Sequence, residues 1–194
     1  MPYEPKKLPS IKVFLLQKSI DKKDARVYEI INFLNNDKSN RKVIIRFNYN
    51  GGGSVPVVEE LVDTLMSIDD REISLVFTGY AISAAAYVLA YFAFYNQKNN
   101  IIVSATEPLC VVYHRPRLLN GRKHIFVEDI PSGRKLTESE KYIIRMTSEF
   151  DKVFESMWQT LERLNWTIAP HMPDVYTNKG DVSLPFEKGR INKR

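Results

Sequence analysis

The stretch Leu75-Val-Phe-Thr-Gly-Tyr-Ala-Ile-Ser-Ala-Ala-Ala-Tyr-Val-Leu-Ala-Tyr-Phe-Ala-Phe-Tyr95 carries no charged side chain over 21 residues. That length would be enough for a helix to cross a bilayer. Residues typical of strands precede Thr78-Gly79, however, and alanine-rich residues typical of helices follow it. We therefore expect a buried strand over residues 73–78, a sharp turn and a buried helix over residues 83–95, and no membrane span.

The same alternation of strand and helix patterns runs through the first 115 residues. Strands that alternate with helices form parallel sheets through right-handed crossovers. The strands are apolar almost throughout, which predicts that helices cover both faces of the sheet. The expected strands lie at residues 11–16, 42–49, 73–78, 101–104 and 109–113, and the expected helices at residues 24–34, 55–66 and 83–95.

The remaining residues predict one long helix. Residues 115–136 are loop-like and basic, and Thr137-Glu-Ser-Glu140 then forms a capping-box pattern that opens a helix over residues 137–164. Apolar side chains lie on two flanks of this helix, so we expect one flank to pack on another subunit; burial of both within the same domain is the alternative. The whole chain, 1–194, is expected to be a single domain, with its α/β core over about residues 1–116 and a C-terminal segment over residues 165–194.

Composition limits the classes of function. The chain has 194 residues, 44% hydrophobic, with a net charge of +5 that is spread along its length. This charge indicates solubility more than a nucleic-acid partner. Cys110 is the single cysteine, which excludes an intrachain disulfide, and we expect it to lie in the core rather than act as a nucleophile. A polar N-terminus and one cysteine fit a cytoplasmic protein with no membrane partner.

Three features along the chain could carry chemistry. Gly51-Gly-Gly53 follows a strand, and its amide groups could hold an oxyanion; the lysine of a phosphate loop is missing, and a plain glycine turn is the alternative. Ser83 lies between a strand and a helix among small residues, as a nucleophile would, or as a helix N-cap. His114 ends a buried strand, where it can serve as a general base or play a structural role. The three histidines show no metal-ligand spacing, so no metal or cofactor is expected.

Taken together and in this order, these motifs resemble the ClpP family of serine peptidases, within the crotonase-like superfamily. The resemblance rests on Asn48-Tyr-Asn-Gly-Gly-Gly-Ser-Val55, on Gly79-Tyr-Ala-Ile-Ser-Ala84 and on Val112-Tyr-His-Arg-Pro116. It covers about residues 11–165. It implies a crotonase/ClpP-like fold, in which a parallel sheet with crossover helices carries a protruding long handle helix.

The resemblance also assigns roles to residues. Ser83 would be the nucleophile and His114 the general base, while the backbone N–H groups of Gly53 and Ala84 would form the oxyanion hole. The third triad member would be Asp174, because it precedes Lys188-Gly-Arg-Ile191 by about the interval that the family shows. Asp181 is the second candidate for this acid, and Asp151, inside the long helix, is the third.

The function implied is a serine endopeptidase that cleaves peptides or unfolded proteins inside a ring-like homo-oligomer. Two alternatives remain open. The altered glycine loop and the divergent C-terminal segment suggest a non-catalytic structural or regulatory subunit, and the superfamily suggests an enzyme that acts on acyl-CoA. The N-terminal segment is shorter than the family's axial loop and first helix, which argues against docking to an AAA+ unfoldase.

Overall fold

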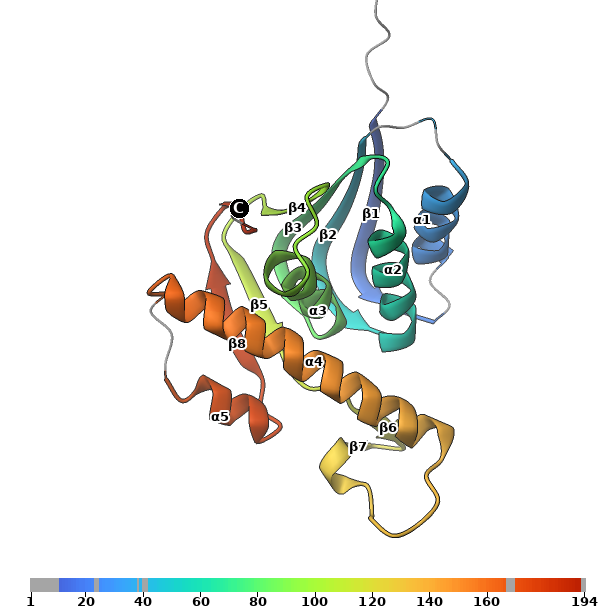
Figure 1. The fold of residues 1–194 in the computed structure, drawn as a ribbon, viewed down its shortest axis with the longest axis vertical. Helices are drawn as coiled ribbons and strands as arrows, with labels where there is room; N and C mark the ends of the chain where they lie inside the picture. The colour runs from blue at the N-terminus through green and yellow to red at the C-terminus, as the bar shows by residue number, and fades with distance from the viewer. Residues whose placement is uncertain (1–10, 23–24, 38, 40–41, 167–169, 193–194) are drawn as a thin grey trace, which may run out of the picture.

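The computed structural model describes residues 11–22, 25–37, 39, 42–166 and 170–192. A seven-stranded sheet organises this part of the chain, and its central strands are parallel, as the sequence predicts (Figure 1). The parallel strands are β1 (Ile11–Ile20), β2 (Lys42–Gly53), β3 (Glu72–Ile82), β4 (Ile101–Ala105) and β5 (Leu109–Tyr113). They run in the order β1-β2-β3-β4, and β5 pairs with the far end of β3, beyond the residues that pair with β4.

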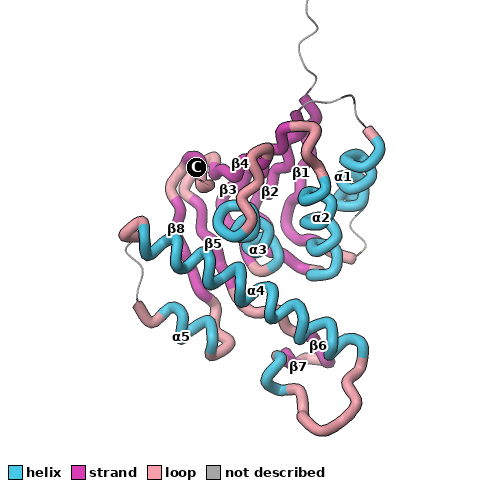
Figure 2. The backbone as a smooth tube through the Cα atoms, in the orientation of Figure 1, coloured by secondary structure: helices cyan, strands magenta, loops and turns pink. Residues whose placement is uncertain are grey.

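Three helices pack on one face of this sheet (Figures 1 and 2). They are α1 (Ala25–Asn36), α2 (Val55–Ser67) and α3 (Ala84–Ala90), the last continued by the π-helical turn η1 (Tyr91–Tyr95). The expectation that helices cover both faces is wrong at β1. Ile11, Val13 and Leu15 alternate with buried residues and are 41–56% exposed.

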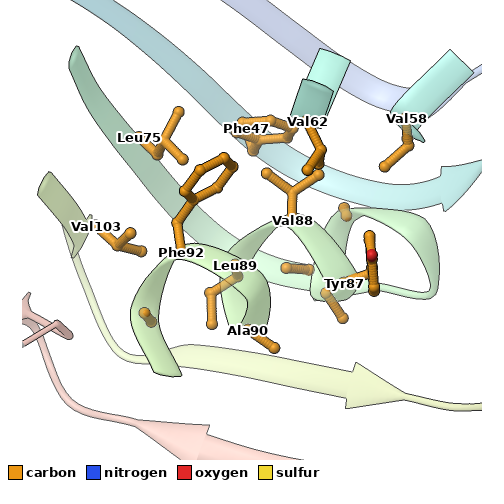
Figure 3. Close-up of a cluster of buried hydrophobic side chains, with 14 of the residues drawn as sticks. Phe47, Val58, Val62, Leu75, Tyr87, Val88, Leu89, Ala90, Phe92 and Val103 are labelled. Atoms are coloured by element: carbon orange, nitrogen blue, oxygen red, sulfur yellow. The ribbon is translucent and has the colours of Figure 1, made fainter. Parts of the chain in front are cut away.

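The core lies between the sheet and this helical layer. Figure 3 shows side chains from both layers meeting there: Phe47 and Leu75 from β2 and β3, Val62 from α2, and Val88 from α3. Phe47 also stacks on Phe77 with ring centroids 4.7 Å apart. Each such buried side chain contributes about 1.5–3 kcal/mol of transfer free energy. Burial in this layer therefore anchors β3 and α3, the two elements that flank Ser83.

The uncharged stretch 75–95 forms a strand and a helix, but its turn lies later than expected. Strand β3 continues through Gly79 to Ile82, and the chain turns at Ser83. Gly79 has a φ of +74°, and a Cβ there would lie 2.2 Å from the Tyr49 ring, so glycine makes room for that ring rather than ending the strand. Within the described residues, no helix is long and apolar enough to span a membrane.

The long helix is α4 (Glu138–Arg163), and Thr137 caps it with Glu140 as predicted. Its two apolar flanks are both covered by the same chain. Phe150 stacks on Tyr87 at 4.1 Å, and Phe154 stacks at 3.9 Å on Tyr176 of α5 (Met172–Thr177). The expectation that the second flank faces another subunit is therefore wrong for these residues, because α5 of the same chain covers them.

The remaining elements are a small hairpin beside α4 and two strands that extend the main sheet. The hairpin of β6 (Leu118–Asn120) and β7 (Lys123–Ile125), with the 3-10 turn η2 (Val127–Asp129), lies beside the N-terminal half of α4 (Figure 1). After α5, β8 (Val182–Phe186) runs antiparallel to β5, and β9 (Gly189–Arg190) antiparallel to β4. The expected core position of Cys110 is wrong, because its side of β5 is exposed at that residue.

Candidate active site

Ser83 occupies a strained turn between β3 and α3. Its φ of 58° and ψ of −122° are rarely adopted by a residue with a side chain. Its N–H donates to the carbonyl of Val112 on β5 at 2.9 Å, and its side chain makes no capping hydrogen bond to α3. A serine on a sharp strand-to-helix turn presents its hydroxyl as the nucleophile does in the elbows of hydrolases. Strain of about 1–3 kcal/mol at such a residue persists only where the surrounding fold imposes it.

The glycine loop at the end of β2 packs directly on this turn. A Cβ at Gly52 would lie 2.8 Å from the Ser83 Cβ and 2.7 Å from the Ala84 nitrogen. The N–H of Gly52 is held by the Asn50 Oδ1 at 2.9 Å. Gly53 follows, and a Cβ there would lie 2.1 Å from the Ile20 carbonyl oxygen. The structure thus brings the glycine loop and the start of α3 together. The three glycines belong to the end of β2, so they do not form the plain turn that is the alternative interpretation.

His114 directly follows β5, the strand whose Val112 carbonyl accepts the hydrogen bond from the Ser83 N–H. The parallel pairing of Ile82 with Val112 places Ser83 level with Tyr113, one residue before the histidine. The His114 side chain is buried, and its Nδ1 lies 2.8 Å from the carbonyl oxygen of Arg115. Since a carbonyl can only accept, Nδ1 carries the proton and Nε2 has the free lone pair. Sequence patterns gave no sign of this backbone partner.

Burial is the main cause that lowers the pKa of His114 below its usual value, and the positive charge of Arg117 lowers it further. The hydrogen bond to the Arg115 carbonyl raises this pKa, and so does the charge of Asp181. Burial outweighs these two groups. A neutral imidazole at pH 7 is the form that a general base requires.

The three candidate acids occupy different places. Asp181 directly precedes β8, one step beyond the pairing of Val182 with Tyr113, so the antiparallel register sets it opposite His114. Asp174 lies in the first turn of α5 with its side chain exposed, and none of the hydrogen bonds or ion pairs among the described residues joins it to His114. Asp151, on α4, binds the side chain of Arg115 instead.

A cavity of about 970 Å³ adjoins the glycine loop. Gly53, Val55 and Pro56 line it on one side, and Arg117 with the N-terminal turns of α4 on the other. Ser83 and His114 lie outside its lining. Among the described residues, no three His, Cys, Asp or Glu side chains cluster in a way that could hold a metal ion.

Comparison with known proteins identifies the family to which this chain belongs. A search among curated proteins finds no match to the chain. The sequence profile of the Clp protease family matches residues 6–167, which include the glycine loop, Ser83, His114 and the whole of α4. Asp174 and Asp181 lie beyond the matched residues. Because the match extends over most of the chain and the sheet with its long helix has the expected architecture, the chain belongs to the Clp protease family.

Proposed function

We propose that this chain is a serine endopeptidase with Ser83 as its nucleophile and His114 as its general base. The observation that carries the proposal is the strained conformation of Ser83, at φ 58°, on a turn that is hydrogen-bonded to β5, the strand that His114 directly follows. A plain N-cap serine would adopt an extended backbone and bond to its helix, and Ser83 does neither.

The reaction follows from the protonation state of His114. Nε2 accepts the hydroxyl proton as the Ser83 Oγ attacks the peptide carbonyl, and a tetrahedral oxyanion forms. The imidazolium then returns this proton to the leaving amine, the C–N bond breaks, and an acyl-enzyme remains on Ser83. Water, deprotonated by the same Nε2, hydrolyses the ester and regenerates the serine.

The oxyanion hole is proposed at the meeting point of the glycine loop and α3. The Ala84 N–H is in the first turn of a helix, where amide groups lack partners within the helix. The Gly53 N–H is the second donor that the family resemblance suggests. Close packing of Gly52 on Ser83 and Ala84, which leaves no room for a Cβ, supports this placement. Each donor is worth about 3–4 kcal/mol in the transition state.

Asp181 is our proposal for the carboxylate that stabilises the imidazolium, in preference to Asp174. Its position opposite His114 in the β5–β8 register supports this choice, as does its effect on the pKa of His114. Asp174 has neither property: it lies in the first turn of α5, away from the β5–β8 pairing.

Family membership also supports a protein substrate and assembly of several copies into a closed chamber. The exposed Ile11, Val13 and Leu15 on β1 provide apolar surface of the kind that subunits bury. Partnership with an AAA+ unfoldase remains a separate proposal, which binding of such an ATPase to the assembled protein would test.

A non-catalytic subunit is the second candidate, and one observation favours it. Among the described residues, no hydrogen bond links the Ser83 hydroxyl to His114 in this structure. Catalytic hydrogen bonds in unliganded enzymes are often long and tighten only when substrate binds, so we rank this candidate second.

Hydrolysis of an unfolded protein separates the two candidates. The wild-type protein is incubated with a permanently unfolded substrate beside Ser83→Ala, and product termini are read by mass spectrometry. We expect new peptide termini with wild type and none with Ser83→Ala at equal folded concentration. Equal cleavage by both proteins would assign the activity to a contaminant and contradict the proposal.

A further inference from the structure

Arg115 directly follows His114, and its guanidinium bonds to α4, η2 and α5. Its Nε and Nη2 donate to the two carboxylate oxygens of Asp151 at 3.0 and 2.9 Å. Its Nη1 donates to Glu128 of η2 at 2.6 Å and to the carbonyl of Thr177, the last residue of α5, at 3.3 Å. Three segments of the chain, α4, η2 and α5, therefore converge on one side chain that is only 14% exposed.

Asp151 is itself fixed from a second direction. The Tyr176 hydroxyl donates to its Oδ1 at 2.8 Å, and the Arg115 guanidinium lies over the Tyr176 ring, 5.3 Å from its centroid. A two-pronged pair between a planar guanidinium and a carboxylate restricts both side chains in orientation as well as distance. We call Arg115, Asp151 and Tyr176 the clamp.

The clamp lies one peptide away from the general base. The carbonyl of Arg115 is the group that accepts the Nδ1–H of His114, at 2.8 Å. Pro116 follows, and a residue before proline is confined to extended conformations, which restricts the direction of its carbonyl. The direction of that carbonyl is thus set by Pro116 along the chain and by the clamp through the side chain.

We propose that Arg115 and Asp151 are positioning residues for the general base: by holding the Arg115 carbonyl, the clamp keeps the His114 proton on Nδ1 and Nε2 free for Ser83. The acid of a catalytic triad usually both orients the imidazole and stabilises its positive charge. Here two different groups would perform these tasks. The Arg115 carbonyl orients the ring, and Asp181 supplies negative charge without a hydrogen bond to it. This inference rests on the proposed function for its meaning in catalysis, but the arrangement of His114 is testable without any activity.

The test reads the tautomer of His114 directly. Protein labelled with ¹⁵N at histidine is examined by NMR at a pH where the imidazole is neutral, and His114 is assigned from the spectrum of His114→Gln. We expect the Nδ1–H tautomer in wild type. In Asp151→Asn and Arg115→Lys we expect a growing Nε2–H population, together with about a tenfold slower reaction of Ser83 with a fluorophosphonate, since a misplaced base loses orientation.

Two matched controls isolate the clamp. Glu155→Gln makes the same carboxylate-to-amide change on an exposed residue one turn further along α4, and Glu128→Gln removes only the outer partner of Arg115. Both should keep the wild-type tautomer. Circular dichroism checks that each variant is folded. If both clamp variants fail to fold, Tyr176→Phe, which removes only the hydroxyl bonded to Asp151, is read in their place and should also gain Nε2–H population.

Each outcome decides the inference. An Nε2–H tautomer in wild type would overturn it, as would an unchanged tautomer in folded Asp151→Asn and Arg115→Lys. A tautomer that changes in Asp181→Asn alone would assign the orienting role to that carboxylate instead. The expected tautomer in a wild-type protein that does not react with the fluorophosphonate would leave this inference standing and contradict the proposed peptidase function.

Discussion

His114 lies between two parts of the molecule that are held in place by different means. On one side, Ser83 is fixed by the backbone: its N–H bonds to Val112, Gly52 packs on it, and every residue of α3 behind it is buried. On the other side, Asp181 is an exposed residue at the start of β8, positioned by pairing with β5. The proposed nucleophile is therefore part of the core, whereas the carboxylate proposed to support the base lies on a surface segment.

This difference predicts that changes on the two sides will have different consequences. Changes on the Ser83 side should disturb the fold and the chemistry together, because the same contacts support both. Changes on the Asp181 side should reduce the chemistry and leave stability nearly intact. Three substitutions test the comparison, and the largest effect is expected where the glycine loop meets Ser83.

Gly52→Ala should abolish reaction with a fluorophosphonate and lower the free energy of unfolding by about 1–3 kcal/mol. The new Cβ would lie 2.3 Å from the Ile82 carbonyl oxygen at a φ of +76°, so the loop has to move away from Ser83. Denaturant unfolding and labelling rates measure the two effects. Gly121→Ala is the control, because its φ is +62° but open space surrounds it. Wild-type labelling by Gly52→Ala would show that this contact does not shape the site.

Asp181→Asn should slow turnover by roughly tenfold, since a partly solvated charge near the imidazolium is worth about 1–2 kcal/mol. The free energy of unfolding should change by less than about 0.5 kcal/mol, as for an ordinary surface substitution. Steady-state hydrolysis and denaturant unfolding measure these quantities beside Asp174→Asn. A larger loss in Asp174→Asn than in Asp181→Asn would move the acid to α5 and contradict the register argument.

Arg117→Ala should produce the smallest effect, a shift in pH dependence. Reaction at Ser83 needs neutral His114, so the rate falls as pH drops through the pKa of that residue. Burial, then the Arg117 charge, keep this pKa below the ordinary histidine value, so activity should persist at a lower pH than an ordinary histidine allows. Removing the Arg117 charge raises the pKa, and the acidic midpoint of the labelling rate should move upward. A downward shift would show that Arg117 does not act on His114 through its charge.

Most of the fold followed from local patterns in the sequence. The alternation of strands and helices up to Tyr113 and the capping box at Thr137 both predict elements that the structure contains. The positions of Ser83 and His114 at strand ends were also evident. The sequence places the turn before Ser83 too early, because a glycine after a strand-like run is typical of a strand end. In the structure, Gly79 instead leaves room for the ring of Tyr49, which lies 30 residues away in sequence.

The surroundings of His114 could not be predicted because they depend on long-range pairing. Asp181 approaches the histidine only through the antiparallel register of β8 with β5, and the spacing of acids in residues 165–194 does not encode that register. The Arg115 carbonyl is a backbone group and leaves no mark in composition. Coverage of the second flank of α4 was missed for the same reason, since α5 returns to Phe154 through Tyr176.

Labelling with a fluorophosphonate probe, read by intact mass, tests the central claim most directly. Wild type is compared with Ser83→Ala and His114→Ala, each shown to be folded. We predict that wild type gains the mass of one probe per chain, that Ser83→Ala gains none, and that His114→Ala reacts at least 100-fold more slowly. A folded wild-type protein that gains no mass, alone or when its full assembly is present, would contradict an active Ser83 and identify the chain as a non-catalytic member of its family.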